Sequence, residues 1–315
     1  MALVVASMTV ADLVSPPQAA TLAPRAYLER DDAPVHGPPP PKEILPDGLA
    51  ILSALSAPTT TRKLSATFQQ LGYDLNRVAS GDGGVPRVLL TSFPGDIDKV
   101  RETKLRKTVF FKTVLPLVLV VNEEIRAERQ RLWRLRYQRD TDQDLDAVDR
   151  LWLMTMAEKY DVEDEDIDTL LRRADVIPPS LALAQAAEES GWGTSRFTRE
   201  GNAIFGEWTF GKKSGLTPER RDEGKTHKVR IFDNLLDSVR AYANNLNTHR
   251  AYRELRLERA AMRHRGETLD GHALAAMLTR YSERGPDYVK TLRSIMRVNA
   301  LRRLDGARLA ADRDI

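Results

Sequence analysis

Two adjacent glutamates, Glu188 and Glu189, stand at the end of an alanine-rich apolar run and directly before a Ser-Gly-Trp-Gly turn. A carboxyl group in the last turn of a helix feels the negative end of the helix dipole, and a neighbouring indole such as Trp192 shields it from water. Both effects raise the pKa of the carboxyl group. A glutamic acid that stays protonated near neutral pH can act as the general acid that cleavage of a glycosidic bond requires. From position alone, two surface residues at a fraying helix end are the simpler interpretation.

The element that must position these carboxylates is a short helix. Pro178 and Pro179 end one element and pre-set the first turn of the next, with Ser180 close to its N-terminus. From Leu181 the run LALAQAAEE has small side chains, which is typical of a helix that packs on most of its surface. Gly191 then follows where a helix C-cap favours glycine.

Residues 1–42 are expected to form a flexible leader and proline-rich linker. The stretch from Leu3 to Val14 is mildly apolar, but Asp12 interrupts it and no Lys or Arg precedes it, so a conventional signal peptide lacks its charged front. A truncated or misassigned start would account for this. Residues 15–41 are rich in Pro and Ala and are expected to be extended, either as a spacer or as an ordinary disordered N-terminus.

Residues 43–140 are predicted to form an N-terminal helical region. Residues 85–94, VPRVLLTSFP, resemble one strand bounded by prolines. A long helix is predicted from about Val100, because apolar residues then recur at spacings of 3 and 4. These residues are Phe110, Phe111, Val114, Leu115, Val118, Val121 and Ile125.

The apolar part of this long helix is predicted to be buried in the protein. VFFKTVLPLVLVV contains Lys112 and Pro116 and is 13 residues long, whereas a bilayer span needs roughly 18 to 20. The basic stretch from Arg126 to Arg139 is interpreted as a solvated helix face, with contact to an anionic partner as the alternative.

A short acidic break from Asp140 to Asp146 is interpreted as a domain boundary, so that residues 141–315 form the second domain. A helix ending near Tyr160 follows, and a second one carries Leu170 and Leu171. The apolar face of the first helix is predicted to consist of Val148, Leu151, Trp152 and Met156.

Composition excludes several classes of chemistry. The chain of 315 residues has no cysteine, which excludes disulfides, cysteine-ligated zinc and a thiol nucleophile. No phosphate-binding loop and no Gly-x-Ser-x-Gly elbow is present. No metal and no cofactor is predicted, because the histidines are scattered without ligand spacing. They are His36, His227, His249, His264 and His272.

A long ordered series of motifs carries a family resemblance. VIPPSLALAQAAEESGWG is followed by SRF, then GNAIFG, then KVRIFDNLLDSVRAYANNLNTH, within roughly Val148 to Val298. The series resembles the Bax-like branch of the bacterial endo-β-N-acetylglucosaminidases, glycoside hydrolase family 73. The segment RKTVFFKTVLPLVLVVNEEIRAER is similar to the N-terminal part of the same group.

The resemblance implies an α+β fold that is mostly α-helical: a lysozyme-like domain with a small β-lobe, preceded by the N-terminal helical region. It implies an enzyme that cuts the β-1,4 bond after N-acetylglucosamine in peptidoglycan, with glycan strands as its partner. By the same resemblance Glu189 is the general acid and Glu188 a bystander. The implied location is the periplasm or cell envelope, with an inner-membrane anchor if the start is truncated.

Further site residues are carried over from the resemblance or inferred from side-chain type. Tyr281 matches a tyrosine that the family places near the glutamate, where its hydroxyl could position the acetamido group of the sugar. Asn202 either bonds the substrate or holds the loop. Trp192, Phe205 and Trp208 offer flat faces for a sugar ring, although core packing is the default for each. Tyr242 is interpreted as a core residue.

The second carboxylate is the open question in this sequence. Glycosidases commonly use a paired acid to activate water, except where the acetamide of the substrate assists. The family carries that acid in a lobe that corresponds to residues 206–232 here. Glu223 is our choice, because it lies just before a strand-like stretch, and Glu219, Asp222 and Glu207 are rivals.

Two alternative functions stay open. A lytic transglycosylase would use one glutamic acid on the same fold and no second carboxylate, and a glycan-binding or scaffold protein would keep the groove without catalysis. Nucleic acid is not predicted as a partner, because 48 basic residues are matched by 45 acidic ones and no binding motif is present.

Overall fold

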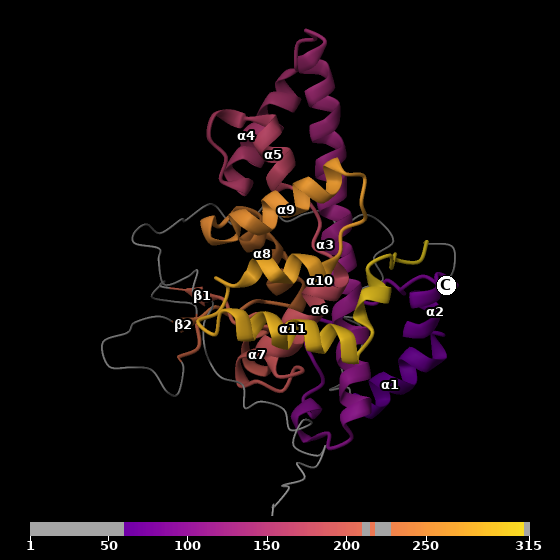
Figure 1. The fold of residues 1–315 in the computed structure, drawn as a ribbon. Coiled ribbons are helices and arrows are strands. Elements are labelled where there is room, and N and C mark those ends of the chain that lie inside the picture. The colour runs from indigo at the N-terminus through magenta and orange to yellow at the C-terminus, as the bar shows by residue number, and fades with distance from the viewer. Residues whose placement is uncertain (1–59, 210–214, 218–227, 312–315) are drawn as a thin grey trace, which may run out of the picture.

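The computed structural model describes residues 60–209, 215–217 and 228–311, and this part of the chain consists mainly of helices (Figure 1). The α-helices are α1 Thr61–Gln70, α2 Leu75–Ser80, α3 Thr103–Asp140, α4 Ala147–Tyr160, α5 Ile167–Arg173, α6 Pro179–Ser190, α7 Arg196–Gly201, α8 Leu235–Thr248, α9 Arg253–His264, α10 Gly271–Leu274 and α11 Pro286–Val298. Short 3-10 helices are Ile97–Lys99, Glu163–Glu165, Arg250–Tyr252, Ala275–Leu278 and Leu301–Leu304. The prediction of a mostly α-helical protein is confirmed.

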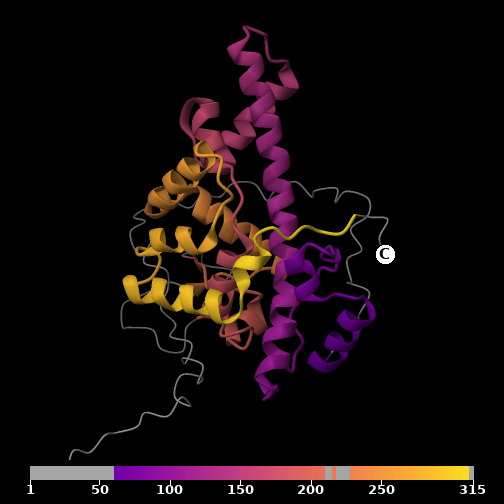
Figure 2. The same cartoon turned by 45° about the vertical axis from the view of Figure 1, so that its right-hand side comes forward.

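The long helix α3 runs through the molecule and is the element against which the others pack (Figure 2). It contacts α1, α5, α6 and α8. Its residues 109–122 are all buried, including Pro116, so the prediction of a long buried helix is confirmed. In the part of the chain that the structure describes, no helix combines the length and apolar character that crossing a membrane requires.

The basic C-terminal half of α3 is neutralised by carboxylates of neighbouring helices. Arg131 and Arg134 both lie within 3.0 Å of Asp149 on α4. Arg136 and Arg139 both lie 3.2 Å from Asp168 on α5. Exposed pairs of this kind contribute little stability individually. They show that these arginines are paired with carboxylates of the protein, whereas the sequence also allowed contact with an anionic partner.

The buried face of α4 differs from the predicted one. Of the predicted residues, Met156 is buried and Trp152 is partly buried, but Val148 and Leu151 are 68% and 65% exposed. Leu153 and Tyr160 complete the buried face. The helix has apolar residues on more than one face, so their spacing did not decide which face packs. Its actual neighbours form a second, smaller core of α3, α4 and α5. That core includes Leu132, Leu135, Ile167, Leu170, Leu171 and Ala174.

The strand predicted for residues 85–94 is absent. Val85 forms a single parallel bridge with Leu309, and the chain beyond it is not a strand. Pro86 has no backbone N–H to donate to a ladder, which interrupts pairing directly after Val85, and Leu89 is again only a lone bridge residue. The apolar run instead fills the core: Leu89 is 4% exposed.

Two strands of two residues each, β1 Trp208–Thr209 and β2 Lys228–Val229, pair in antiparallel orientation. Leu216 adds an isolated antiparallel bridge to Val229. Most of the residues between the two strands lie outside the described part of the chain. The small β-lobe therefore stays a prediction.

The main hydrophobic core joins helices from both sides of the predicted domain boundary. It includes Leu64 of α1, Val114 of α3, Leu183 of α6 and Leu292 of α11. The acidic break coincides with the end of α3 and the start of α4. The division into residues 1–42, 43–140 and 141–315, and with it the separate N-terminal helical region, stays a prediction, and the leader lies outside the described residues.

Candidate functional site

Helix α6 fixes the position of Glu189 because it is buried over almost its whole length. Pro179 occupies its first turn, and the backbone N–H and hydroxyl of Ser180 donate to the Asp305 carboxylate at 2.7 and 2.8 Å. Gly191 ends the helix in the left-handed conformation, with φ of 57°. The predicted helix and its glycine cap are confirmed, and Glu189 lies in the last turn.

Four buried tyrosines lie within electrostatic reach of the Glu189 carboxyl group. Burial raises the pKa of each hydroxyl, and the negative charge of Glu189 adds to that increase in all four, which places their hydroxyls within its electrostatic reach. They come from four different segments and are at most 1% exposed: Tyr242, Tyr252, Tyr281 and Tyr288. Their rings make the protein interior beside Glu189 largely aromatic.

A chain of hydrogen bonds ends on Glu189. The hydroxyl of Tyr242 donates to Oε1 of Gln185 at 2.7 Å, and Nε2 of Gln185 donates to the hydroxyl of Tyr288 at 3.0 Å. The Tyr288 hydroxyl in turn donates to the Glu189 carboxyl group. Because Gln185 lies one turn before Glu189 on α6, both side chains face the same tyrosines.

Burial raises the pKa of Glu189 to about 8, and the charge of Glu188 adds to the increase. The hydrogen bond from Tyr288 and the positive charge of Arg284 act in the opposite direction. Glu188 itself is ion-paired with Arg284. The two adjacent carboxylates thus have different environments, and Glu189 is protonated at neutral pH, as a general acid must be.

Trp192 was expected to shield the Glu189 carboxyl group, but its indole packs against α3. Its indole is 8% exposed and packs edge-on against Phe110 and Phe111 of α3, with ring centroids 5.8 and 5.3 Å away. Lys107 lies over the ring, 4.4 Å from its centroid. Of the tyrosines near Glu189, Tyr281 was expected there from the family resemblance, whereas Tyr252 and Tyr288 were not identified from the sequence.

Phe205 and Asn202 hold the loops beside the site. Phe205 is fully buried and stacks on Tyr242 with centroids 3.8 Å apart. Asn202 ends α7 in the left-handed conformation, and its Nδ2 donates to the backbone oxygens of Phe232 and Asp233 at 3.1 and 3.3 Å. Of the two roles considered for Asn202, the structure shows the one that holds the loop.

Tyr281 and Trp208 complete the set of residues named for substrate binding. Tyr281 is 1% exposed and stacks on Tyr288 with centroids 5.3 Å apart, so it lies in the tyrosine group around Glu189. Trp208 lies in β1, and its side chain is outside the described part of the chain.

A second buried carboxyl group, Glu207, lies just before β1. It is 4% exposed, and burial raises its pKa to about 8 against the opposing charge of Arg230, whose Nη1 lies 3.9 Å from Oε2. Its Oε1 has no hydrogen-bond partner among the described residues. Both Glu207 and Glu189 raise the pKa of Tyr252, so the two carboxyl groups act on the same tyrosine.

The remaining candidates for the second acid, Glu223, Glu219 and Asp222, lie outside the described residues. Within the segments that are described, no group of three or more histidine, aspartate or glutamate side chains is placed to hold a metal ion. The described part of the site therefore consists of side chains that can transfer protons or form hydrogen bonds.

Comparison with known proteins identifies the family. The family described as mannosyl-glycoprotein endo-beta-N-acetylglucosaminidase matches residues 165–301, which contain α6, Glu207 and the four tyrosines. The chain is also 34% identical to Protein bax of Escherichia coli (strain K12) over 199 residues, 61% of this chain and 69% of that protein. This chain belongs to the Bax-like glucosaminidase-domain proteins. No solved structure is significantly similar to it.

Membership in the Bax-like family confirms the resemblance and indicates a glycoside hydrolase that acts on a glycan. In this Bax-like protein the matched segment provides the half-buried acid at the end of α6. Gln185 could have been found from the sequence, because it precedes Glu189 by one helical turn. Tyr252 and Tyr288 had no such signal, since only the tertiary fold brings them to Glu189.

Proposed function

We propose that this Bax-like protein is an endo-β-N-acetylglucosaminidase with a lysozyme-like fold, which hydrolyses the β-1,4 bond after N-acetylglucosamine in peptidoglycan. The observation that carries the proposal is the setting of Glu189. It lies at the end of a buried helix within the matched domain, its pKa is raised to about 8, and it accepts a hydrogen bond from Tyr288.

In the proposed reaction Glu189 gives its proton to the glycosidic oxygen as the bond to the sugar breaks, and an oxocarbenium-like transition state develops on the ring. Arg284 lies beside Glu188 and, with the Tyr288 hydroxyl, stabilises the carboxylate that Glu189 becomes. The proton is later regained from the water that attacks the sugar or from solvent.

The water must be activated by another group. Glu207 does not suit this role, because a carboxyl group with a pKa of about 8 is already protonated at neutral pH and accepts no proton. We therefore keep Glu223 as the proposed base, with the acetamide of the substrate as the alternative. Exchange of Glu223 for Gln distinguishes them: the variant loses activity about 100-fold or more if Glu223 is the base, and keeps it if the acetamide assists.

For substrate contacts we propose Trp208 as the stacking platform and Tyr281 as the residue that positions the acetamido group. Trp192 and Phe205 are assigned to packing beneath the site, because both are buried against other rings. Asn202 supports the loop. A peptidoglycan substrate places the protein in the periplasm or cell envelope, which fractionation of producing cells would test.

Mass spectrometry of purified peptidoglycan digested by the protein tests the proposed reaction. The expected products end in reducing N-acetylglucosamine. Glu189→Gln is expected to lower their rate of formation by about 100- to 10,000-fold, the contribution typical of a general acid. Glu188→Gln makes the same chemical change one residue earlier and is expected to retain activity within about tenfold, because Glu188 contributes only through its charge.

Other products would assign the protein differently. Anhydro-muramic ends would show a lytic transglycosylase, since there the hydroxyl of the sugar itself attacks. Glycan binding without any product would show a non-catalytic wall-binding protein. Equal activity of Glu189→Gln and the unaltered protein would contradict the assignment of Glu189.

A further inference from the structure

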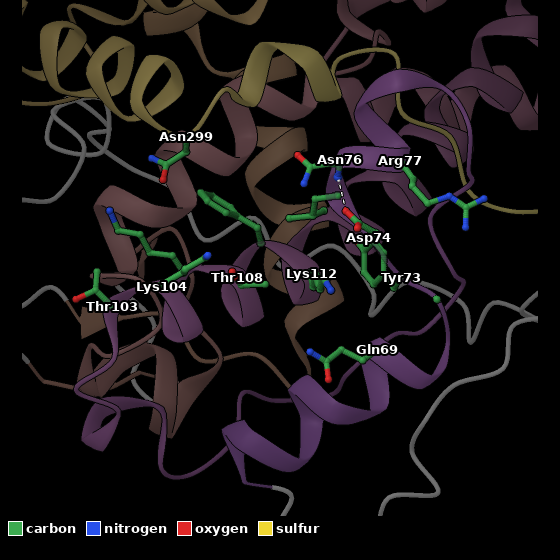
Figure 3. A pocket seen from close by; sticks show the side chains of 14 residues that line it. Gln69, Tyr73, Asp74, Asn76, Arg77, Thr103, Lys104, Thr108, Lys112 and Asn299 are labelled. Atoms are coloured by element: carbon green, nitrogen blue, oxygen red, sulfur yellow. Dashed lines mark hydrogen bonds between the residues drawn. The ribbon is translucent and has the colours of Figure 1, made fainter.

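A cleft of about 920 Å³ lies between the segment that joins α1 to α2 and the first turns of α3 (Figure 3). Tyr73, Asp74 and Asn76 line it from one side, and Lys104 and Lys112 from α3. None of these residues belongs to the group around Glu189. The cleft is therefore a feature that the proposed catalytic reaction does not use.

The cleft carries an excess of positive charge. Four cationic side chains line it, and the only carboxylate among the lining residues is Asp74, which caps α2 by accepting from the N–H of Asn76 at 2.7 Å. Among the described residues, none of the four cations lies within 4.0 Å of a carboxylate oxygen. The four are Arg77, Lys104, Lys107 and Lys112.

Among these side chains, Lys112 gives the strongest support for a bound anion because the residue is buried. It is 9% exposed, and its ammonium group lies over the rings of Phe68 and Tyr73, 5.9 and 5.3 Å from their centroids. It makes no hydrogen bond within the described part of the chain. Burial lowers the pKa of Lys112 and the charge of Asp74 offsets this only in part, so an anion in the cleft would add to the counter-charge.

The C-terminal half of α3 offers a comparison, because its arginines are paired with carboxylates of the protein itself. Arg131, Arg136 and Arg139 of α3 all lie within 3.2 Å of a carboxylate of α4 or α5. By comparison, the cations of the cleft have no carboxylate oxygen within 4.0 Å among the described residues, although Arg77 donates to the backbone oxygen of Asp82 at 3.2 Å. This contrast favours an external anion over a merely solvated face.

The size and the lining of the cleft indicate what kind of anion fits. Cations stand on both sides of a space far larger than one inorganic phosphate, which suits separate carboxylates along an extended ligand. Gln69, Asn76 and Asn299 offer amide groups for a peptide backbone, and Phe111 offers an apolar face. We propose that the cleft binds a peptide that carries several carboxylates.

The proposed peptide site shares a wall with the catalytic turn. Phe111 lines the cleft and contacts the ring of Trp192 at 5.3 Å, and Lys107 lines the cleft and lies over the same ring. Trp192 follows Glu189 by three residues. Peptides with several carboxylates are attached to peptidoglycan glycan strands, so the identification of the peptide as a substituent of the glycan rests on the proposed function.

Calorimetry with a free peptide tests the cleft without the glycan. The probe is the synthetic tetrapeptide L-Ala-γ-D-Glu-diaminopimelate-D-Ala, and the protein is the full chain with Glu189→Gln, so that cleavage plays no part. Binding is expected for the peptide and loss of binding for its fully amidated form. Lys104→Gln with Lys107→Gln, and separately Arg77→Gln, are each expected to weaken binding by about tenfold, the loss of roughly one charged hydrogen bond.

Lys63→Gln is the matched control for Arg77→Gln, since Lys63 is an exposed lysine of α1 outside the cleft and its exchange also removes one positive charge. It is expected to bind as the parent does. Thermal unfolding of each variant checks that it is folded, and Arg77→Gln keeps the test decisive if the double variant is not.

Three results would overturn the proposal: no binding at millimolar peptide, binding that the cleft substitutions leave unchanged, or tight binding of single-stranded DNA through these cations in place of the peptide. The result is independent of catalysis. If the protein binds the peptide but cleaves no glycan, the peptide site is supported and only the proposed glucosaminidase activity is contradicted.

Discussion

The amide group of Gln185 donates a hydrogen bond to the hydroxyl of Tyr288 at 3.0 Å, and this contact orients the hydroxyl toward Glu189. Gln185 is in turn fixed by Tyr242, whose hydroxyl donates to its Oε1. The direction of the amide is thereby determined, because its oxygen accepts from one tyrosine while its nitrogen donates to the other. The consequence is a Tyr288 hydroxyl that has its own proton free for the Glu189 carboxyl group.

Replacing Tyr288 with Phe removes the donor that stabilises ionised Glu189. The pKa of Glu189 should rise above its value of about 8, because the hydrogen bond from Tyr288 lowers it. The alkaline limb of the pH profile of kcat/KM is therefore expected to move to higher pH, with a rate at pH 7 lower by about tenfold as orientation is lost. Tyr137→Phe, at an exposed tyrosine far along α3, is the matched control. An unchanged alkaline limb in Tyr288→Phe would contradict the hydrogen bond.

Replacing Glu207 with Gln should stabilise the protein at high pH. The folded-state pKa of about 8 lies above the ordinary value of 4.5. The unfolded chain therefore releases a proton between pH 4.5 and 8 while the folded chain keeps it, and stability falls across that interval. An amide does not ionise, so Glu207→Gln is expected to be about 1 to 3 kcal/mol more stable than the parent at pH 8 and similar at pH 4.5.

Urea unfolding at the two pH values measures this difference, with the exposed Glu163→Gln as control. Equal stability of Glu207→Gln and the parent at both pH values would mean that the carboxyl group is ionised in the folded protein. Glu207 would then be available as a base, and the choice of Glu223 would need revision.

Asn202 is expected to matter for stability through its backbone conformation and its side chain together. It has φ of 51°, a left-handed value that costs an alanine about 1 kcal/mol but not a glycine. Asn202→Ala should lose this amount and the two hydrogen bonds to residues 232 and 233, about 2 to 3 kcal/mol in total. Asn202→Gly should lose about 1 kcal/mol less. Equal losses for Gly and Ala, measured by urea unfolding, would exclude the backbone contribution.

Asp175 lies between two arginines of α9, the buried Arg259 and the exposed Arg263. It is 2% exposed and lies 2.9 Å from Nη2 of Arg263 and 3.9 Å from Nε of the fully buried Arg259. Asp175→Asn leaves these cations without a counter-charge and is expected to cost about 3 to 5 kcal/mol. Asp168→Asn, which breaks an exposed pair with Arg136, is expected to cost at most about 1 kcal/mol.

The pH dependence of this network has a definite sign. Burial would raise the pKa of Asp175, but the charges of Arg259 and Arg263 more than offset it, so the pKa is lowered. Its stabilising effect is therefore present above the ordinary aspartate range and is lost as the pH falls below it. A parent protein whose stability at pH 3 equals that at pH 6, with Asp175→Asn following the same curve, would contradict this.

The sequence predicted the elements whose patterns are local. Helix α6 followed from Pro179 and Gly191, and α3 from the spacing of its apolar residues. A raised pKa of Glu189 was predicted from the sequence, but only Trp192 and the helix dipole were named as its causes. The tyrosines that bury the carboxyl group come from segments up to about a hundred residues away, and one sequence contains no signal for such contacts.

The errors have physical causes of the same kind. The buried face of α4 was misassigned because Val148 and Leu151 have apolar neighbours at several spacings, and only packing on α3 selects Leu153. The strand at residues 85–94 was predicted from composition, whereas a strand needs continuous pairing, and this segment has only isolated bridge residues at Val85 and Leu89. The burial of Glu207 could not be predicted either, because burial of a glutamate is not visible in sequence.

Titration of the Glu189 carboxyl carbon by NMR tests the central claim most directly. Protein labelled with ¹³C at the glutamate side-chain carboxyl groups is titrated from pH 4 to 10, and the Glu189→Gln variant identifies the resonance that disappears. A midpoint near 8 is expected, since burial among the tyrosines disfavours the ionised form. A midpoint near the ordinary value of 4.5 would show an ionised Glu189 at neutral pH and would contradict its assignment as the general acid.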